Sequence, residues 1–209
     1  MEIIQEQYRI STTEQLNGLF DQVGEASLTK ELSYIHPHYQ AMIAASPFAL
    51  LASGGTDGLD ISPRGDAPGF VVVHDMHTLL LPDRRGNNRI DSLRNILVDP
   101  HVALLFLIPG VGETLRVNGQ ASISIQPELL QKFAMDGKLP KCVLIIKVEK
   151  VFFQCARAIK RAKLWQPLAE NPKPKLPSAG TILAALSNAK IDGEIYDRDL
   201  PARQAATLY

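Results

Sequence analysis

The stretch Glu113-Thr114-Leu115-Arg116-Val117-Asn118-Gly119-Gln120-Ala121-Ser122-Ile123-Ser124-Ile125 has the clearest periodicity in the chain. Apolar and polar side chains alternate along it, which is typical of a β-strand that buries one face. The apolar face comprises Leu115, Val117, Ala121, Ile123 and Ile125, with Gly119 in phase. A shift of one residue would expose this whole set, so the register is strongly fixed. The pattern predicts a long strand whose apolar face lies in the core.

Shorter runs on both sides of this strand predict a mainly β fold. Val102–Ile108 is continuously apolar, which predicts a strand buried on both faces. The other runs are divided by Gly, Pro and Asp, and they are Phe48–Ala52, Leu59–Ser62, Phe70–Val73, Thr78–Leu81 and Cys142–Phe153. Helices are predicted at Arg89–Val98 and Gln126–Met135. This order favours a small β-barrel with flanking helices over a doubly wound parallel sheet.

Three segments are predicted along the chain. Residues 1–45 form a polar helical segment, in which Ser11 or Thr12 caps one helix and another begins after His36-Pro37. Residues 46–165 hold the barrel. Residues 166–209 form a C-terminal arm, where a proline-rich stretch at 171–177 precedes an apolar helix that Ser178 caps. The arm suits packing over a partner subunit or over its own barrel.

Composition excludes several classes of protein. The 209 residues carry 22 Lys and Arg against 22 Asp and Glu, so the basic surplus of a nucleic-acid-binding protein is absent. The apolar run Val102–Ile108 is too short to span a bilayer, and the N-terminus lacks the features of a signal peptide. Cys142 and Cys155 fit buried thiols in a reducing compartment. We expect a soluble cytoplasmic protein without nucleic-acid or membrane partners.

The segment Asp83-Arg84-Arg85-Gly86-Asn87-Asn88-Arg89 carries the strongest chemical signal. It places three arginines and a glycine just before a predicted helix. Unpaired N–H groups at a helix N-terminus attract anions. A guanidinium group can donate two parallel hydrogen bonds to phosphate oxygens. Gly86 permits a turn that brings N–H groups close to an anion, and Asn87 or Asn88 can cap the helix. The segment predicts a phosphate-binding loop, with a solvated basic turn as the alternative.

A second group, Ser62-Pro63-Arg64-Gly65, ends a predicted strand and begins a loop rich in Gly and Pro. Its proline and glycine shape a turn that leaves Ser62 and Arg64 free to reach a ligand. A plain β-turn explains the proline and glycine without explaining the arginine. The group is a weak signal on its own.

Other residues give no defensible catalytic or metal site. His36 and His38 have no third ligand at a suitable spacing, so a solvated helix start is the simpler interpretation and no metal site is predicted. No nucleophile–base pair is present in the pattern, so the catalytic residues stay unknown.

The order of these motifs resembles the FMN-binding split-barrel flavoproteins related to pyridoxamine 5'-phosphate oxidase, over roughly residues 46–165. The resemblance rests on Leu59-Asp60-Ile61-Ser62-Pro63-Arg64-Gly65 and on Leu79-Leu80-Leu81-Pro82-Asp83-Arg84-Arg85-Gly86-Asn87-Asn88-Arg89. Asp99-Pro100-His101-Val102-Ala103-Leu104-Leu105-Phe106 and Thr114-Leu115-Arg116-Val117-Asn118-Gly119 follow in the same order.

This resemblance implies FMN at a homodimer interface, with its phosphate on the loop and helix start after a barrel strand. Asn87, Asn88 and Arg89 match the family's Ser-Arg-Lys phosphate triplet, with Arg84 and Arg85 as compensating cations. Arg64 matches a basic residue near the flavin, and Leu81 and Pro82 match the strand end beneath its ring. Thr114 stands where the family commonly has a glutamine that faces the ring. Lys160 and Trp165 correspond to the C-terminal segment that the other subunit contributes in the family.

The resemblance implies an FMN-dependent oxidoreductase acting on an unknown small molecule. Vitamin B6 oxidation is disfavoured because the chain's end lacks the family's arginine-rich substrate motif. A non-catalytic flavin-binding or sensing module is the alternative, as is a split barrel that binds F420 or haem. For haem, the histidines of the barrel region are His74, His77 and His101, each more simply a surface or strand-end residue.

Overall fold

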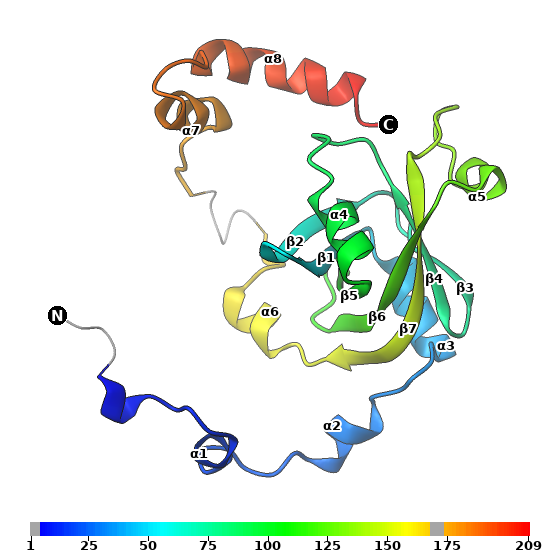
Figure 1. The fold of residues 1–209 in the computed structure, drawn as a ribbon, viewed down its shortest axis with the longest axis vertical. Helices are drawn as coiled ribbons and strands as arrows, with labels where there is room; N and C mark the ends of the chain where they lie inside the picture. The colour runs from blue at the N-terminus through cyan, green and yellow to red at the C-terminus, as the bar shows by residue number, and fades with distance from the viewer. Residues whose placement is uncertain (1–4, 168–173) are drawn as a thin grey trace. The chain divides into compact units, whose positions relative to one another are not determined.

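In the computed structural model, which describes residues 5–167 and 174–209, seven antiparallel strands form one sheet in the order β2-β1-β5-β6-β7-β4-β3 (Figure 1). The strands are β1 (Phe48–Gly55), β2 (Gly58–Gly65), β3 (Val72–Asp75), β4 (Thr78–Asp83), β5 (His101–Leu107), β6 (Thr114–Ser124) and β7 (Cys142–Gln154). The mainly β architecture with flanking helices is confirmed, and it is that of a split barrel.

The two longest strands divide the sheet into two halves. The first half of β6 pairs with β5, while its second half continues only along β7. The first half of β7 in turn pairs with β4. The pairing of β6 with β7 shifts register between Asn118 and Gly119, and a Cβ on Gly119 would lie 2.1 Å from the carbonyl oxygen of Lys147. Because no side chain fits there, the close approach of the two strands requires glycine.

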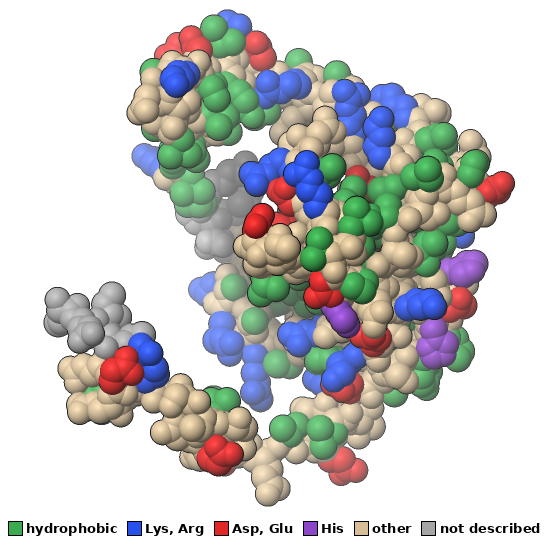
Figure 2. All heavy atoms as spheres, in the orientation of Figure 1, with side chains coloured by type: hydrophobic (Ala, Val, Ile, Leu, Met, Phe, Trp, Pro, Cys, Tyr) green, Lys and Arg blue, Asp and Glu red, His purple; other side chains and the backbone are tan. Residues whose placement is uncertain are grey.

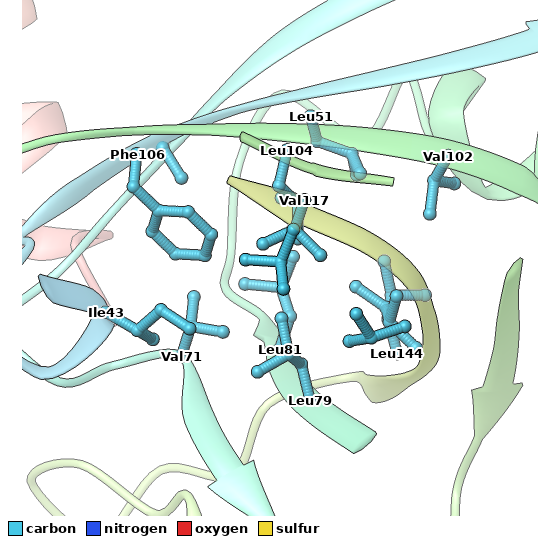
Figure 3. Packing of buried hydrophobic residues seen from close by; sticks show 14 of the residues in the cluster. Ile43, Leu51, Val71, Leu79, Leu81, Val102, Leu104, Phe106, Val117 and Leu144 are labelled. Carbon is cyan, nitrogen blue, oxygen red and sulfur yellow. The ribbon is translucent and has the colours of Figure 1, made fainter. Parts of the chain in front are cut away.

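Apolar side chains from both halves meet in one core. Leu51, Leu104 and Phe106 lie opposite Leu79 and Leu81, as Figure 3 shows. Each of these five side chains is at most 1% exposed. In β6 the predicted apolar face is buried through Leu115, Val117 and Ala121, but the prediction for Ile125 is wrong, because it lies beyond the strand end and is 73% exposed. The strand β5 buries one face fully and the other partly, so the expectation of two buried faces holds in part.

The helices that follow Leu32 are α3 (Pro37–Ala45), α4 (Asp91–Val98), α5 (Pro127–Lys132), α6 (Arg157–Ala162), α7 (Ala179–Leu186) and α8 (Gly193–Ala206). The predicted start of α3 at Pro37 and the Ser178 cap of α7 are confirmed. The sequence patterns gave no signal for α8, whose interior contains Pro201. The predicted proline-rich stretch lies partly outside the described residues. None of the described helices is long and apolar enough to cross a membrane.

Contacts between residues divide the chain into two compact units, with the boundary after Glu31. The N-terminal unit carries the 3-10 helix η1 (Glu6–Tyr8) and the helices α1 (Thr13–Asn17) and α2 (Glu25–Thr29). Thr12 caps α1 as predicted, because its hydroxyl accepts the N–H of Gln15 and the Gln15 side chain accepts in return. No described residue of η1, α1 or α2 is buried.

Candidate functional site

Strand β2 presents a polar face and an apolar face. Asp60, Ser62 and Arg64 alternate along it and are half-buried on one side. Leu59 and Ile61 occupy the other side and are 95% and 62% exposed. Since the side-chain period of a strand is two, Asp60 belongs with the two predicted residues on the same face.

The connection between β4 and α4 has an unusual backbone. Asn88 and Ile90 adopt left-handed conformations, with φ of 60° and 53°. Helix α4 begins at Asp91, and its N-cap, Ile90, makes no side-chain hydrogen bond to the helix. The prediction that Asn87 or Asn88 caps the helix is therefore wrong. The Asn87 carboxamide oxygen instead accepts the N–H of Arg89 at 3.1 Å, within the loop.

The backbone at Gly86 lacks the special conformation that the predicted turn implied. It is not among the glycines with positive φ, and a Cβ at this position would meet no atom within 4 Å. The turn that brings the loop over the helix start is made by Asn88 and Ile90, so the backbone there does not require glycine at position 86.

The polar face of β2, the segment 83–93 and Lys141 enclose a cavity of about 680 Å³. The uncapped first turn of α4 forms part of its wall. Five cationic side chains face three carboxylates around it, so the cavity carries a net positive charge. Figure 2 shows Lys and Arg side chains, interspersed with acidic ones, where Figure 1 draws the β4–α4 connection. These features suit an anionic ligand.

The arginines around the cavity differ in how they are held. Arg89 is exposed, and its Nε donates to Asp91 at 2.8 Å. Arg84 donates its Nε to Asp66 at 2.7 Å and a terminal N–H to the carbonyl of Phe133 at 2.5 Å. The hydroxyl of Tyr209 also donates to Asp66, and the Tyr209 ring lies 5.6 Å from the Arg84 guanidinium carbon. Arg84 thus fixes the loop to its surroundings, which leaves Arg85 and Arg89 as its more available cations.

Arg64 and Asp83 face each other inside the cavity, with 3.7 Å between a guanidinium nitrogen and a carboxylate oxygen. Burial raises the pKa of Asp83, and the charge of Arg64 offsets only part of that rise. Burial, with the nearby Asp83 charge, also raises the pKa of the Cys142 thiol to about 11. The Nε of Arg64 is buried without a hydrogen-bond partner among the described residues, so it is a donor left for a ligand.

A hydroxyl network joins β2 to the start of α4. Ser92, the second residue of α4, is 3% exposed, and its Oγ donates to Asp60 at 2.9 Å. The Oγ atoms of Ser62 and Ser92 are also 2.9 Å apart. These contacts hold the polar face of β2 against the helix start.

The structure brings together many of the predicted site residues but not all of them. Those that line the cavity are Ser62, Arg64, Arg84, Arg85, Gly86, Asn87, Asn88 and Arg89. Pro63 lies on the opposite face of β2, while Leu81 and Pro82 are buried in β4. The cavity wall as described includes none of Thr114, Lys160 and Trp165, and the Trp165 indole donates to the carbonyl of Val111. A flavin contact by any of these residues stays a prediction.

Other cavity residues were not predicted, and they are Asp60, Asp83, Ile90, Asp91, Ser92, Leu93 and Lys141. The alternation of side chains along β2 could have indicated that Asp60 shares a face with Ser62 and Arg64. Lys141 lies just before β7, and its N–H donates to the carbonyl of Asp83, a contact that no local pattern indicates. The expectation of two buried thiols is wrong for Cys155, which is exposed. No cluster of His, Cys, Asp and Glu suited to a metal ion occurs within residues 5–167 and 174–209.

A family model described as pyridoxamine 5'-phosphate oxidase matches residues 35–155. No curated protein matches the sequence significantly. HupZ of Group A Streptococcus is 21% identical, with a TM-score of 0.48 over 58% of this chain and 94% of that one. General Stress Protein 26 of Bacillus anthracis is 20% identical, with a TM-score of 0.40 over 54% and 88%. A Clostridium acetobutylicum protein related to general stress protein 26 is 14% identical, with a TM-score of 0.43 over 56% and 86%.

Proposed function

Because the chain belongs to the pyridoxamine 5'-phosphate oxidase family, we propose that it binds FMN and acts as an FMN-dependent oxidoreductase on a small molecule. The observation that carries this proposal is the uncapped N-terminus of α4, which opens into a cavity of net positive charge. Free N–H groups and the positive end of the helix dipole favour a phosphate at that point.

The side chains around the cavity fit the rest of this assignment. Arg85 and Arg89 stand beside the α4 start and supply charge-assisted hydrogen bonds to phosphate oxygens. Arg64 supplies the buried Nε donor, which has no hydrogen-bond partner within the described part of the chain. A buried N–H donor without a hydrogen bond costs stability unless a ligand accepts that hydrogen bond. The Arg64 Nε therefore favours a bound group that carries a polar acceptor. Lys141 adds a further cation from the other half of the sheet.

Bound FMN supplies the redox chemistry, and the protein binds and orients it. The chain's part is to hold the phosphate at the α4 start, to keep Arg64 aimed into the cavity, and to partly exclude water from Asp83. We assign no proton donor or acceptor for the reaction. We also place the protein in the cytoplasm, consistent with its unpaired cysteines.

We further propose a homodimer with the cofactor at its interface. Strand β2 lies at the edge of the sheet, with one face in the cavity and exposed apolar surface from Leu59 and Ile61 on the other, so a partner that packs on this strand lies next to the cofactor. Light scattering at micromolar concentration should give twice the chain mass of 23.0 kDa. A monomer that keeps FMN would contradict the shared site.

The absorption spectrum of the purified protein tests the assignment of cofactor. We expect a yellow protein that releases FMN on denaturation. An F420 or haem spectrum would assign one of the other split-barrel cofactors. A colourless protein that does not take up added FMN would refute the proposal. Rapid reoxidation of the reduced protein by a candidate acceptor separates an enzyme from a passive flavin-binding module.

A further inference from the structure

The hydroxyl network at the edge of the cavity has a fixed direction. An ionised carboxylate only accepts hydrogen bonds, and a serine hydroxyl has one proton to donate. Ser92 gives its proton to Asp60, at 2.9 Å. The contact between the Ser62 and Ser92 oxygens, also 2.9 Å, therefore uses the proton of Ser62. Ser62 is left with free lone pairs, and it lines the cavity.

This direction determines which ligand group Ser62 can bind. Phosphate oxygens at neutral pH are mainly acceptors, so they find no donor at Ser62 while Ser92 donates to Asp60. A hydroxyl group on the ligand can donate to it. Ser92 is the second residue of α4, so Ser62 lies beside the helix start where the phosphate is proposed to bind. The group that meets Ser62 is therefore a neighbour of the phosphate along the ligand.

We propose that Asp60 and Ser92 orient Ser62 as an acceptor for a hydroxyl of a polyol phosphate, which in FMN is the ribityl chain. Ser62 then determines specificity for the polyol, and Asp60 is a positioning residue that acts through Ser92. This inference rests on the proposed function for the identity of the ligand, but the direction of the network can be tested without flavin.

The flavin test compares FMN with an analogue that carries the same ring and phosphate on a pentyl chain without hydroxyls. Ser62→Ala should weaken FMN binding roughly fivefold, the loss of about one neutral hydrogen bond, and leave the Kd of the analogue unchanged. Ser122→Ala, an exposed serine on β6, is the matched control. Equal weakening of both ligands, or of neither, would overturn the proposal.

The second test uses inorganic phosphate, measured by calorimetry on flavin-free protein. Ser62→Ala should leave the phosphate Kd unchanged in the otherwise unaltered chain. Asp60→Asn supplies an amide that can donate to Ser92, which frees the Ser92 proton for Ser62 and turns the Ser62 proton toward the cavity. Free phosphate is not held away from Ser62 by a polyol, so in that background it can accept the Ser62 proton, and Ser62→Ala should weaken phosphate binding several-fold.

The two tests separate this inference from the proposed function. Phosphate binding that shows this dependence on Asp60, in a protein that does not bind FMN, would refute the flavin assignment and support the network. Sensitivity of phosphate binding to Ser62→Ala with Asp60 intact would overturn the network, even if FMN binds. Absence of phosphate binding in every variant would also overturn it. Matched urea unfolding curves check that the variants fold.

Discussion

Among single residues, Arg89 and Arg94 form a natural pair for locating the phosphate. Both contact Asp91, and their side chains are 77% and 69% exposed, but Arg89 alone of the two lines the cavity. Arg89→Ala should weaken FMN binding roughly ten- to a hundredfold, because it removes a charge-assisted hydrogen bond. Arg94→Ala should leave the Kd unchanged. Equal effects in a fluorescence titration would discredit this placement of the phosphate.

Arg84 has a structural task that its neighbours in the loop do not share. Its partner Asp66 has a side chain only 2% exposed. Burial raises the pKa of Asp66, but hydrogen bonds from Ala67, Tyr209 and Arg84, with the charge of Arg84, hold it below the ordinary value of 3.8. This contribution to stability is present above that ordinary pKa and is lost as the pH falls through the lowered one.

Arg84→Ala should therefore lower the free energy of unfolding by about 3 kcal/mol at neutral pH, because Asp66 is left as an uncompensated buried charge. Adding Asp66→Asn to this variant should restore part of the loss. Urea unfolding measures both. A loss that is unchanged in the double variant would mean that the guanidinium stabilises the loop through Phe133 or Tyr209 rather than through Asp66.

The contribution of Asp83 to stability depends on pH in the opposite direction from that of Asp66. Its pKa in the folded protein is raised from 3.8, so the folded state holds this proton more tightly than the unfolded chain. The stabilising contribution is complete below the ordinary pKa and is lost as the pH rises through the raised one. Relative to the unaltered chain, Asp83→Asn should be more stable at neutral pH than in acid. Urea unfolding over a pH series tests this, and a constant difference would show that the pKa is not shifted.

Among the elements, the close approach of β6 to the bulge in β7 depends on Gly119. Gly119→Ala should destabilise the protein by more than about 2 kcal/mol, because its Cβ would clash with the backbone of Lys147 where β6 and β7 approach. Gly86→Ala is the control, since a Cβ there meets nothing and should cost little. Thermal unfolding compares the two. Equal melting temperatures would show that β7 moves aside without cost.

The strands were predictable because each has a period of two or is a short apolar run bounded by turn residues. Helix α4 was placed correctly, but it begins at Asp91 instead of Arg89. A β-branched residue such as Ile90 has a low preference for left-handed backbone, so sequence preferences did not predict the loop. Helix α8 escaped prediction because Pro201 is unfavourable inside a helix.

At the scale of the whole molecule, the site depends on contacts between distant parts of the sheet. Ser62, Arg64 and the loop 84–89 were predictable because their residue types suit an anion and lie at element ends. Lys141 and the Ser92–Asp60 pair were not, since tertiary packing brings them to the cavity. The flavin contacts proposed for Thr114, Lys160 and Trp165 stay predictions, and they require a partner subunit or a ligand that reaches beyond this cavity.

In the proposed function, the cavity at the start of α4 holds the phosphate of FMN. The most direct measurement is a fluorescence titration of flavin-free protein with FMN and with riboflavin, which differ only in the phosphate. We predict that FMN binds at least a hundredfold more tightly, because its phosphate would gain hydrogen bonds from the helix start and from Arg85 and Arg89, which line the cavity. Equal affinities, or no binding of either flavin, would refute this placement of the phosphate.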